Sequence, residues 1–210
     1  MTEIVSIERD GADTARAELE RCVTGGGVAV FPADTLYGLA CDPLNEAAVE
    51  RIDAIKGRDP AKSSAVMYFS PLAMRELISG LGEGARAAVE ALLPGPVTLV
   101  LANPERRYPL ACREDPGRIG VRLIEGPLAG TAIPVLQTSA NRSGKAPPSS
   151  FDRIDPEIVG DAHLAIDGGE LGGQPSTVLD LSEIDSGGGW RVLREGALPV
   201  VEAKLLLKRL

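Results

Sequence analysis

The chain has 210 residues, of which 44% are hydrophobic and 25% charged, a composition typical of a globular protein that buries a substantial core. A net charge of −8 argues against general binding to nucleic-acid backbones, and no stretch resembles a membrane span or a signal peptide, so we expect a cytoplasmic protein without membrane partners. Three widely spaced cysteines and a single histidine argue against a disulfide framework, a zinc site and chemistry that needs two histidines.

Helix and strand patterns alternate along the chain, which predicts an α/β fold. No repeat, low-complexity tract or long linker divides residues 1–210, so one domain is expected. Periodicity and turn residues predict helices at 14–23, 45–56, 70–79, 82–93, 154–162 and 200–210. The expected strands are an edge strand within 1–9, strands at 28–31, 65–69, 97–102, 119–123, 135–138 and 164–167, and an antiparallel pair at 177–181 and 190–194.

Three connecting segments have informative compositions. A proline after the strand at 28–31 cannot continue a central ladder, so the chain must turn there and expose Asp34, Thr35 and Tyr37 as a binding loop. Residues 103–115 are polar, contain proline and carry three arginines, as expected of an exposed loop or a poorly ordered hairpin. Paired glycines at both ends of 168–173 predict a mobile loop.

The helix that starts near Asn45 ends at Lys56-Gly57-Arg58. By itself this pattern favours helix termination, with glycine at the C′ position and cations near the negative end of the helix dipole. Two cations that flank a flexible glycine could also reach one phosphate chain, so phosphate binding is the alternative.

Arg122 stands among apolar residues in the strand predicted at 119–123. A buried arginine needs an anionic partner. The residues leave two partners open: one of the 30 carboxylates of the chain, in a structural salt bridge, or an anionic ligand.

Several motifs occur in a fixed order and together cover most of the chain. They resemble the YrdC/TsaC family of threonylcarbamoyl-AMP synthases, in its short single-domain form. The matching segments are Pro32-Ala33-Asp34-Thr35-Leu36-Tyr37-Gly38-Leu39, Lys56-Gly57-Arg58, Pro94-Gly95-Pro96-Val97-Thr98-Leu99, Val121-Arg122, Thr138-Ser139-Ala140-Asn141-Arg142-Ser143-Gly144 and Pro175-Ser176-Thr177-Val178.

The resemblance implies a YrdC-like open, twisted mixed sheet with flanking helices and a cationic concave cleft. It also implies an ATP-dependent nucleotidyltransferase. Threonine and bicarbonate would form a carbamate that attacks the α-phosphate, to give threonylcarbamoyl-AMP and pyrophosphate. Downstream transfer proteins would then use the product to modify an adenosine next to the anticodon of tRNA, and direct contact with tRNA is left open.

Matched position by position, the motifs imply roles for individual residues. Lys56 and Arg58 are expected to be catalytic and, with Lys62, to bind the ATP phosphates. The remaining ATP-binding residues would be Arg118, Asn141, Ser149 and Arg194. The threonine-binding residues would be Thr35, Met67, Arg122, Ser139 and Ser176. Mg²⁺ is expected to arrive with the triphosphate, because no carboxylate cluster predicts a protein-built metal site.

Three positions depart from the family pattern and bear on substrate choice. Ala33 stands where the family often has Thr, Lys62 where some relatives have Asn, and Met67 where some carry His. Two other functions remain open. One is the synthesis of a carbamoyl-adenylate, as in a related domain of hydrogenase-maturation enzymes. The other is a non-catalytic RNA-binding module of the same fold, which the acidic composition disfavours.

Overall fold

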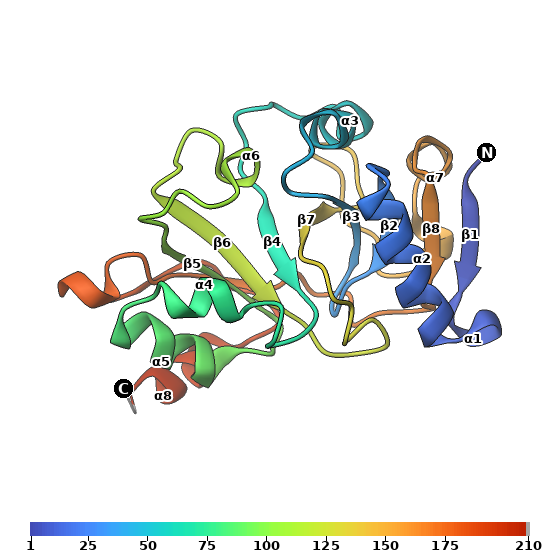
Figure 1. Cartoon of the computed structure of the whole chain (residues 1–210). Coiled ribbons are helices and arrows are strands. Elements are labelled where there is room, and N and C mark those ends of the chain that lie inside the picture. The colour runs from blue at the N-terminus through green and yellow to red at the C-terminus, as the bar shows by residue number, and fades with distance from the viewer. Residues whose placement is uncertain (209–210) are drawn as a thin grey trace.

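The structure is a computed structural model and describes residues 1–208 (Figure 1). In this part of the chain ten strands form one mixed sheet, in the order β1-β8-β2-β3-β7-β4-β6-β5-β9-β10. The strands are β1 Glu3–Ser6, β2 Ala29–Pro32, β3 Tyr37–Cys41, β4 Ala65–Tyr68, β5 Val97–Ala102, β6 Arg118–Leu123, β7 Val135–Ser139, β8 Leu164–Asp167, β9 Thr177–Asp180 and β10 Arg191–Arg194. The α/β class expected from the sequence is confirmed.

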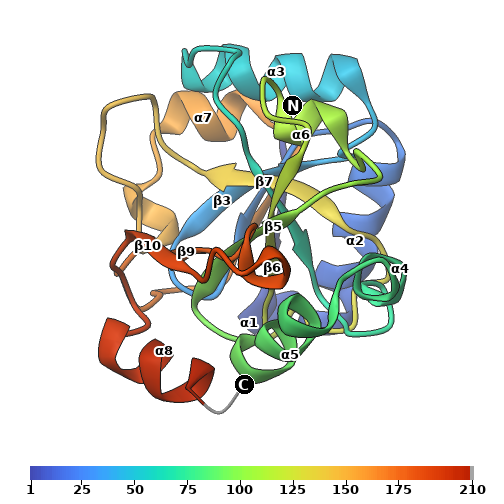
Figure 2. The ribbon, with the colours of Figure 1, turned by 90° about the vertical axis from the view of Figure 1, so that its left-hand side faces the viewer.

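Helices cover the sheet from both sides. Figure 2 shows α3, α6 and α7 on one side of the strands and α4, α5 and α8 on the other. The helices are α1 Ile7–Asp10, α2 Ala12–Thr24, α3 Glu46–Lys56, α4 Arg75–Ser79, α5 Glu83–Leu92, α6 Pro109–Cys112, α7 Pro156–Asp161 and α8 Val200–Leu207. The terminal helix was predicted to reach residue 210, and its last two residues lie outside the described part of the chain.

Alternate residues of the strands pack into two different hydrophobic clusters, as the two-residue period of a strand requires. In β4, Val66 and Tyr68 belong to the larger cluster, whereas Met67 belongs to the smaller one. The larger cluster includes side chains from Val28 to Leu207, so it draws on nearly the whole length of the chain.

The prediction that the turn exposes Thr35 and Tyr37 is wrong, since both side chains are buried. Tyr37 is fully buried and begins β3, a strand that the sequence analysis did not identify, and Pro32 is its partner in the antiparallel pair of β2 and β3. The turn is therefore shorter than expected and comprises residues 33–36. Pro32 is tolerated because it is the last residue of β2, where a missing N–H costs little.

The segment 103–115 is also more ordered than expected. Asn103 is buried, and its amide group donates to the carbonyl oxygens of Arg107 and Pro116 at 2.9 and 3.0 Å. The short helix α6 follows and buries Ala111 and Cys112. The polar composition of this segment suggested a loop with little order. The segment is ordered because the side chain of the buried Asn103 forms hydrogen bonds with backbone carbonyl groups of the turn around it.

The loop 168–173 is held to the rest of the molecule by hydrogen bonds. The backbone N–H groups of Leu171 and Gly173 donate to the carbonyl oxygens of Ser149 and Thr35 at 2.7 and 2.9 Å. Tyr37 adds two contacts, since its hydroxyl accepts from Gly168 N at 2.9 Å and donates to Gly169 O at 2.8 Å. These hydrogen bonds connect the loop, which its glycine content predicts to be mobile, to the turn at 33–36, to Ser149 and to Tyr37.

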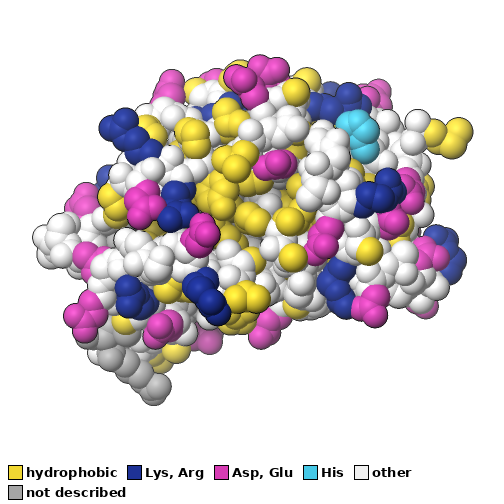
Figure 3. Space-filling model, viewed as in Figure 1, with side chains coloured by type: hydrophobic (Ala, Val, Ile, Leu, Met, Phe, Trp, Pro, Cys, Tyr) yellow, Lys and Arg dark blue, Asp and Glu magenta, His cyan; other side chains and the backbone are white. Residues whose placement is uncertain are grey.

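Figure 3 shows that hydrophobic side chains gather in the hollowed middle of one face, with charged side chains of both signs around them. In residues 1–208 no helix is both long enough and apolar enough to cross a membrane.

Candidate functional site

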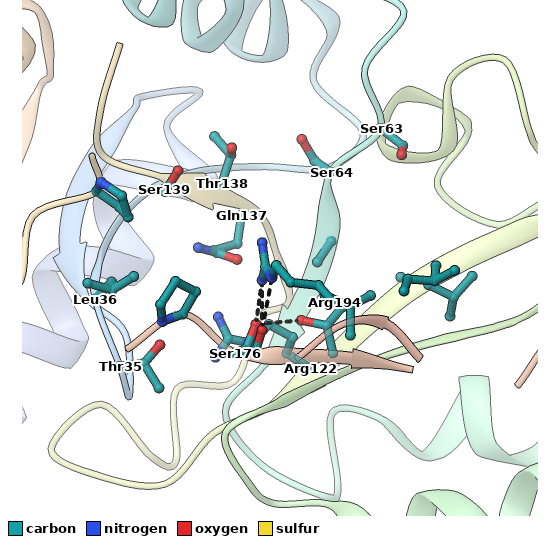
Figure 4. A pocket seen from close by; sticks show the side chains of 18 of the residues that line it. Thr35, Leu36, Ser63, Ser64, Arg122, Gln137, Thr138, Ser139, Ser176 and Arg194 are labelled. Atoms are coloured by element: carbon teal, nitrogen blue, oxygen red, sulfur yellow. Dashed lines mark hydrogen bonds between the residues drawn. The ribbon is translucent and has the colours of Figure 1, made fainter. Parts of the chain in front are cut away.

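A cavity of about 650 Å³ is lined by residues along β5, β6 and β9, by the start of β4, by the end of β7 and by the turn at 33–36 (Figure 4). This volume is within the range of sites that bind small molecules and cofactors. Its polar and charged lining residues are Thr35, Tyr37, Ser63, Ser64, Thr98, Asp115, Arg118, Arg122, Gln137, Thr138, Ser139, Asn141, Ser176, Asp180 and Arg194. The cavity wall therefore contains charges of both signs, from three arginines and two aspartates.

Arg122 lies in the cavity wall and is nearly fully buried. Its Nη2 donates to Asp34 Oδ1 in the turn after β2. The contact is one-sided, because Arg122 Nε and Asp34 Oδ2 are both buried without a hydrogen-bond partner. A guanidinium fork can bind a carboxylate with two parallel bonds, so this pair retains unused donor and acceptor capacity beside the cavity.

Ser176 is another residue of the cavity wall, and Arg194 holds it by hydrogen bonds. Arg194 donates to the Ser176 carbonyl oxygen through Nε and Nη2 at 3.1 and 2.8 Å, and its Nη2 also reaches Ser176 Oγ at 3.2 Å (Figure 4). Burial and the neighbouring charge of Arg122 lower the pKa of Arg194. Two guanidinium groups that repel each other in a sheltered site are stabilised by a shared anion.

Lys56 is buried behind the wall, at the C-terminal end of α3. Its Nζ donates to the carbonyl oxygens of Ser139 and Asn141, the latter at 2.7 Å. Burial, followed by the charges of Arg58 and Lys62, lowers the pKa of Lys56 from 10.5 to about 8. The two carbonyl acceptors favour the protonated amine, so Lys56 carries a charge at neutral pH.

Arg58 is the centre of a buried ionic network. Its Nε donates to Asp53 Oδ1 at 2.7 Å, and Arg113 Nη2 donates to the other oxygen of Asp53 at 2.6 Å. Arg58 Nη2 also donates to the Lys62 carbonyl oxygen at 2.7 Å and to Ser64 Oγ at 2.9 Å. Arg58 therefore fixes the loop that carries Ser64 into the cavity wall.

With this geometry in place, comparison with known proteins identifies the family. The family model described as telomere recombination, which covers Sua5, YciO and YrdC proteins, matches residues 21–196. The chain belongs to the Sua5/YciO/YrdC family. This confirms the family that the sequence motifs indicate.

Two relatives in the Sua5/YciO/YrdC family have similar sequences. The chain is 33% identical over 194 residues to the threonylcarbamoyl-AMP synthase of Pyrococcus abyssi, a match that covers 87% of this chain and 54% of the relative. It is also 33% identical over 163 residues to the threonylcarbamoyl-AMP synthase of Chromohalobacter salexigens, which covers 74% of this chain and 86% of that relative. The chain thus spans about half of the first relative and most of the second.

A solved structure of the family shares the fold. P. abyssi Sua5 complexed with L-threonine superimposes with a TM-score of 0.82 and 29% sequence identity. The match covers 98% of this chain and 60% of the other. The YrdC-like open mixed sheet expected from the motifs is thereby confirmed.

Seven of the residues that the family motifs suggested line the cavity: Thr35, Arg118, Arg122, Ser139, Asn141, Ser176 and Arg194. Five others do not line it. Lys56 and Arg58 lie behind the wall, Lys62 is exposed, and Ser149 is partly buried under the loop at 168–173. Met67 is fully buried in the smaller hydrophobic cluster, so the structure gives no support for a contact between Met67 and a ligand.

Several lining residues were not identified from the sequence. Thr138 is the first residue of the motif that contains Ser139, Gln137 comes directly before that motif, and Thr98 lies inside the Pro-Gly-Pro motif, so the motifs pointed to these positions. Asp115 and Asp180 lie outside the motifs, so the sequence did not indicate that they line the cavity. Arg118 Nη1 lies 3.7 Å from Asp180, and Arg191 donates to the same carboxylate at 2.7 Å.

In residues 1–208 no three histidine, cysteine or carboxylate side chains cluster in a way that could hold a metal ion. The two carboxylates in the cavity wall both have arginine neighbours, with Arg118 Nε 3.7 Å from Asp115. Hydrogen bonds to Ser182 and Arg191 help to lower the pKa of Asp180 against the effect of burial.

Proposed function

We propose that this protein is a threonylcarbamoyl-AMP synthase, which joins L-threonine, bicarbonate and ATP and releases pyrophosphate. The observation that carries the proposal is the cavity itself. It gathers residues spread along the sequence between Thr35 and Arg194, and three arginines line it, of which Arg122 has an unpaired buried N–H. The product would be passed to proteins that modify tRNA next to the anticodon.

The threonine subsite would lie between Arg122 and Ser176. The unused donors of Arg122 suit the threonine carboxylate, and Asp34, which accepts from Arg122 Nη2 through Oδ1, holds the arginine in place. The hydroxyl groups of Thr35, Ser139 and Ser176 line the same space and supply neutral hydrogen bonds.

The ATP subsite would take up the rest of the cavity. Arg118, Asn141 and Arg194 line it, and the buried Oδ1 of Asn141 has no hydrogen-bond partner. Lys62 would cover the phosphates from the exposed rim, with Ser149 nearby. The charges of Lys56 and Arg58 would act from behind the wall, and together these cations would make the cleft cationic despite the acidic chain. Mg²⁺ would enter bound to the triphosphate, and we assign no protein ligand to it.

These residues would perform the reaction mainly by position and charge. The neutral amine of threonine attacks bicarbonate and water leaves, which gives a carbamate. A carbamate oxygen then attacks the α-phosphorus of ATP, and the bond to the β-phosphate oxygen breaks to release pyrophosphate. Negative charge shifts toward the leaving group in the second step, so fixed cations at the phosphate end stabilise the transition state more than the bound substrates.

Pyrophosphate release from ATP tests the proposal, with threonine and bicarbonate omitted in turn. We expect release only when both are present. Release that continues without threonine contradicts the proposal. Release that instead requires carbamoyl phosphate supports the carbamoyl-adenylate alternative, and RNA binding without any pyrophosphate release supports the non-catalytic one.

A further inference from the structure

Thr98 on β5 belongs to a sequence motif that has no role in the function proposed above. Its side chain is buried in the cavity wall, and its hydroxyl lies 3.0 Å from the hydroxyl of Ser176. β5 pairs with β9 on one side and with β6 on the other. The antiparallel register that places Leu99 opposite Val121 brings Thr98 opposite Arg122 when it is continued by one residue.

The hydrogen bonds around Ser176 restrict where protons can point. A serine hydroxyl can donate one hydrogen bond and accept two. Arg194 can only donate, so it takes one acceptor position of Ser176 Oγ. Either hydroxyl can donate to the other within the pair of Thr98 and Ser176, and in both cases one hydroxyl proton remains without a partner. Both residues line the cavity, so that proton is available to a ligand.

We propose that Thr98 is a positioning residue for threonine. Its hydroxyl donates to Ser176 Oγ, which fills the second acceptor position and directs the Ser176 proton to the carboxylate of the substrate beside Arg122. This inference rests on the proposed function, because it needs threonine as the ligand. It adds a residue that acts through Ser176 and fixes the direction of a hydrogen bond to the carboxylate.

Thr98→Val removes the hydroxyl and keeps the shape of the side chain. Loss of one oriented hydrogen bond to a charged group is expected to raise the KM for threonine about tenfold, with the KM for ATP unchanged. Thr98→Ser keeps the hydroxyl and should restore the parental KM for threonine. Thr131→Val is the matched control, because Thr131 is a buried threonine outside the cavity whose hydroxyl donates to Leu128 O at 2.8 Å.

A double-mutant cycle separates positioning from general packing. If Thr98 acts through Ser176, then Thr98→Val combined with Ser176→Ala should raise the KM for threonine no further than Ser176→Ala alone. Independent effects that multiply in the double variant, or a Thr98→Val variant with the parental KM, overturn the inference. Should Thr98→Val fail to fold, Thr98→Ala takes its place in the same cycle. A parent protein without threonine-dependent pyrophosphate release would instead overturn the proposed function, and with it the inference.

Discussion

Arg122 lies at the boundary between the buried sheet and the cavity. Its partner Asp34 is 88 residues away in the sequence, so the salt bridge left open by the sequence does exist. The ligand alternative also stands, since a guanidinium has five donors and Arg122 Nε remains unpaired. Arg122 can therefore bind Asp34 through Nη2 and still offer donors to a second carboxylate.

Arg122→Lys separates these two roles. A lysine can keep the charge next to Asp34, but it cannot form the planar two-bond contact with a carboxylate. We expect threonine binding to weaken by about 2 kcal/mol, while ATP binding changes little. Titration calorimetry of both substrates measures this, with Arg75→Lys at an exposed position as the control. Normal threonine binding together with a lower melting temperature would assign Arg122 to structure alone.

Lys56 gives a prediction about pH. Its pKa is lowered to about 8 in the folded protein, below the ordinary value of 10.5. Between these two values the unfolded chain binds more protons than the folded one, so the free energy of unfolding rises with pH. Below pH 8 the side chain is charged in both states, and the full cost of burying the charge is present.

The expected outcome is a difference in slope between the parent and Lys56→Met. Relative to the variant, the parent should gain stability from pH 8 to about 10.5 and show no relative change from pH 6 to 7. Urea unfolding at each pH measures both proteins. Parallel curves over the whole range would mean that the pKa of Lys56 is not lowered.

The C-terminal end of helix α3 places two cations, Lys56 and Arg58, behind the cavity wall. Asn45 caps its start by accepting from Ala48 N at 3.0 Å, and Gly57 ends it in the left-handed conformation with φ of 55°. Both features were predicted. The sequence did not predict that Lys56 and Arg58 bind protein groups that form the wall, so simple capping accounts for neither cation.

Arg58→Ala tests whether this helix end carries stability. A surface cation near a helix end contributes only about 0.3–1 kcal/mol. The buried partner Asp53 would keep Arg113 but lose Arg58, so we expect a loss of about 2–4 kcal/mol in the free energy of unfolding. Chemical denaturation measures it, with the exposed Arg75→Ala as the control. A loss below 1 kcal/mol would show that the network is weak.

At the scale of the whole molecule, Tyr37 joins segments that are distant in sequence. Its backbone N–H donates to Pro148 O at 3.0 Å, its carbonyl accepts from Ala140 N at 2.9 Å, and its hydroxyl holds Gly168 and Gly169. Burial raises the pKa of Tyr37 to about 12, so the hydroxyl stays protonated at physiological pH. One side chain thus fastens the loop at 168–173 beside the cavity.

Tyr37→Phe should remove the hydrogen bonds between residue 37 and the loop at 168–173, while the aromatic ring still fills its place in the core. Loss of two buried hydrogen bonds is expected to cost about 1–3 kcal/mol and to speed amide exchange at Gly168, Leu171 and Gly173. Hydrogen exchange measured by mass spectrometry tests this, and the amides of α2 provide the internal reference. Uniform acceleration over the whole chain would point to general destabilisation instead of local release.

The sequence by itself determined the local elements and the family. The cap at Asn45, the stop at Gly57 and the limits of β5 and β8 follow from side-chain chemistry within a few residues, so they could be predicted. The ordered motifs indicated the family, and many of the residues within them do reach the cavity.

Tertiary structure alone decided which groups meet. The burial of Tyr37, the pairing of Arg122 with Asp34 and the contact of Lys56 with the carbonyl oxygen of Ser139 join residues far apart in the chain. Such contacts depend on strand order and register, which no local pattern encodes. For the same reason Thr98 became a candidate only when β5 and β9 were seen side by side, because its partner Ser176 lies 78 residues further along the chain.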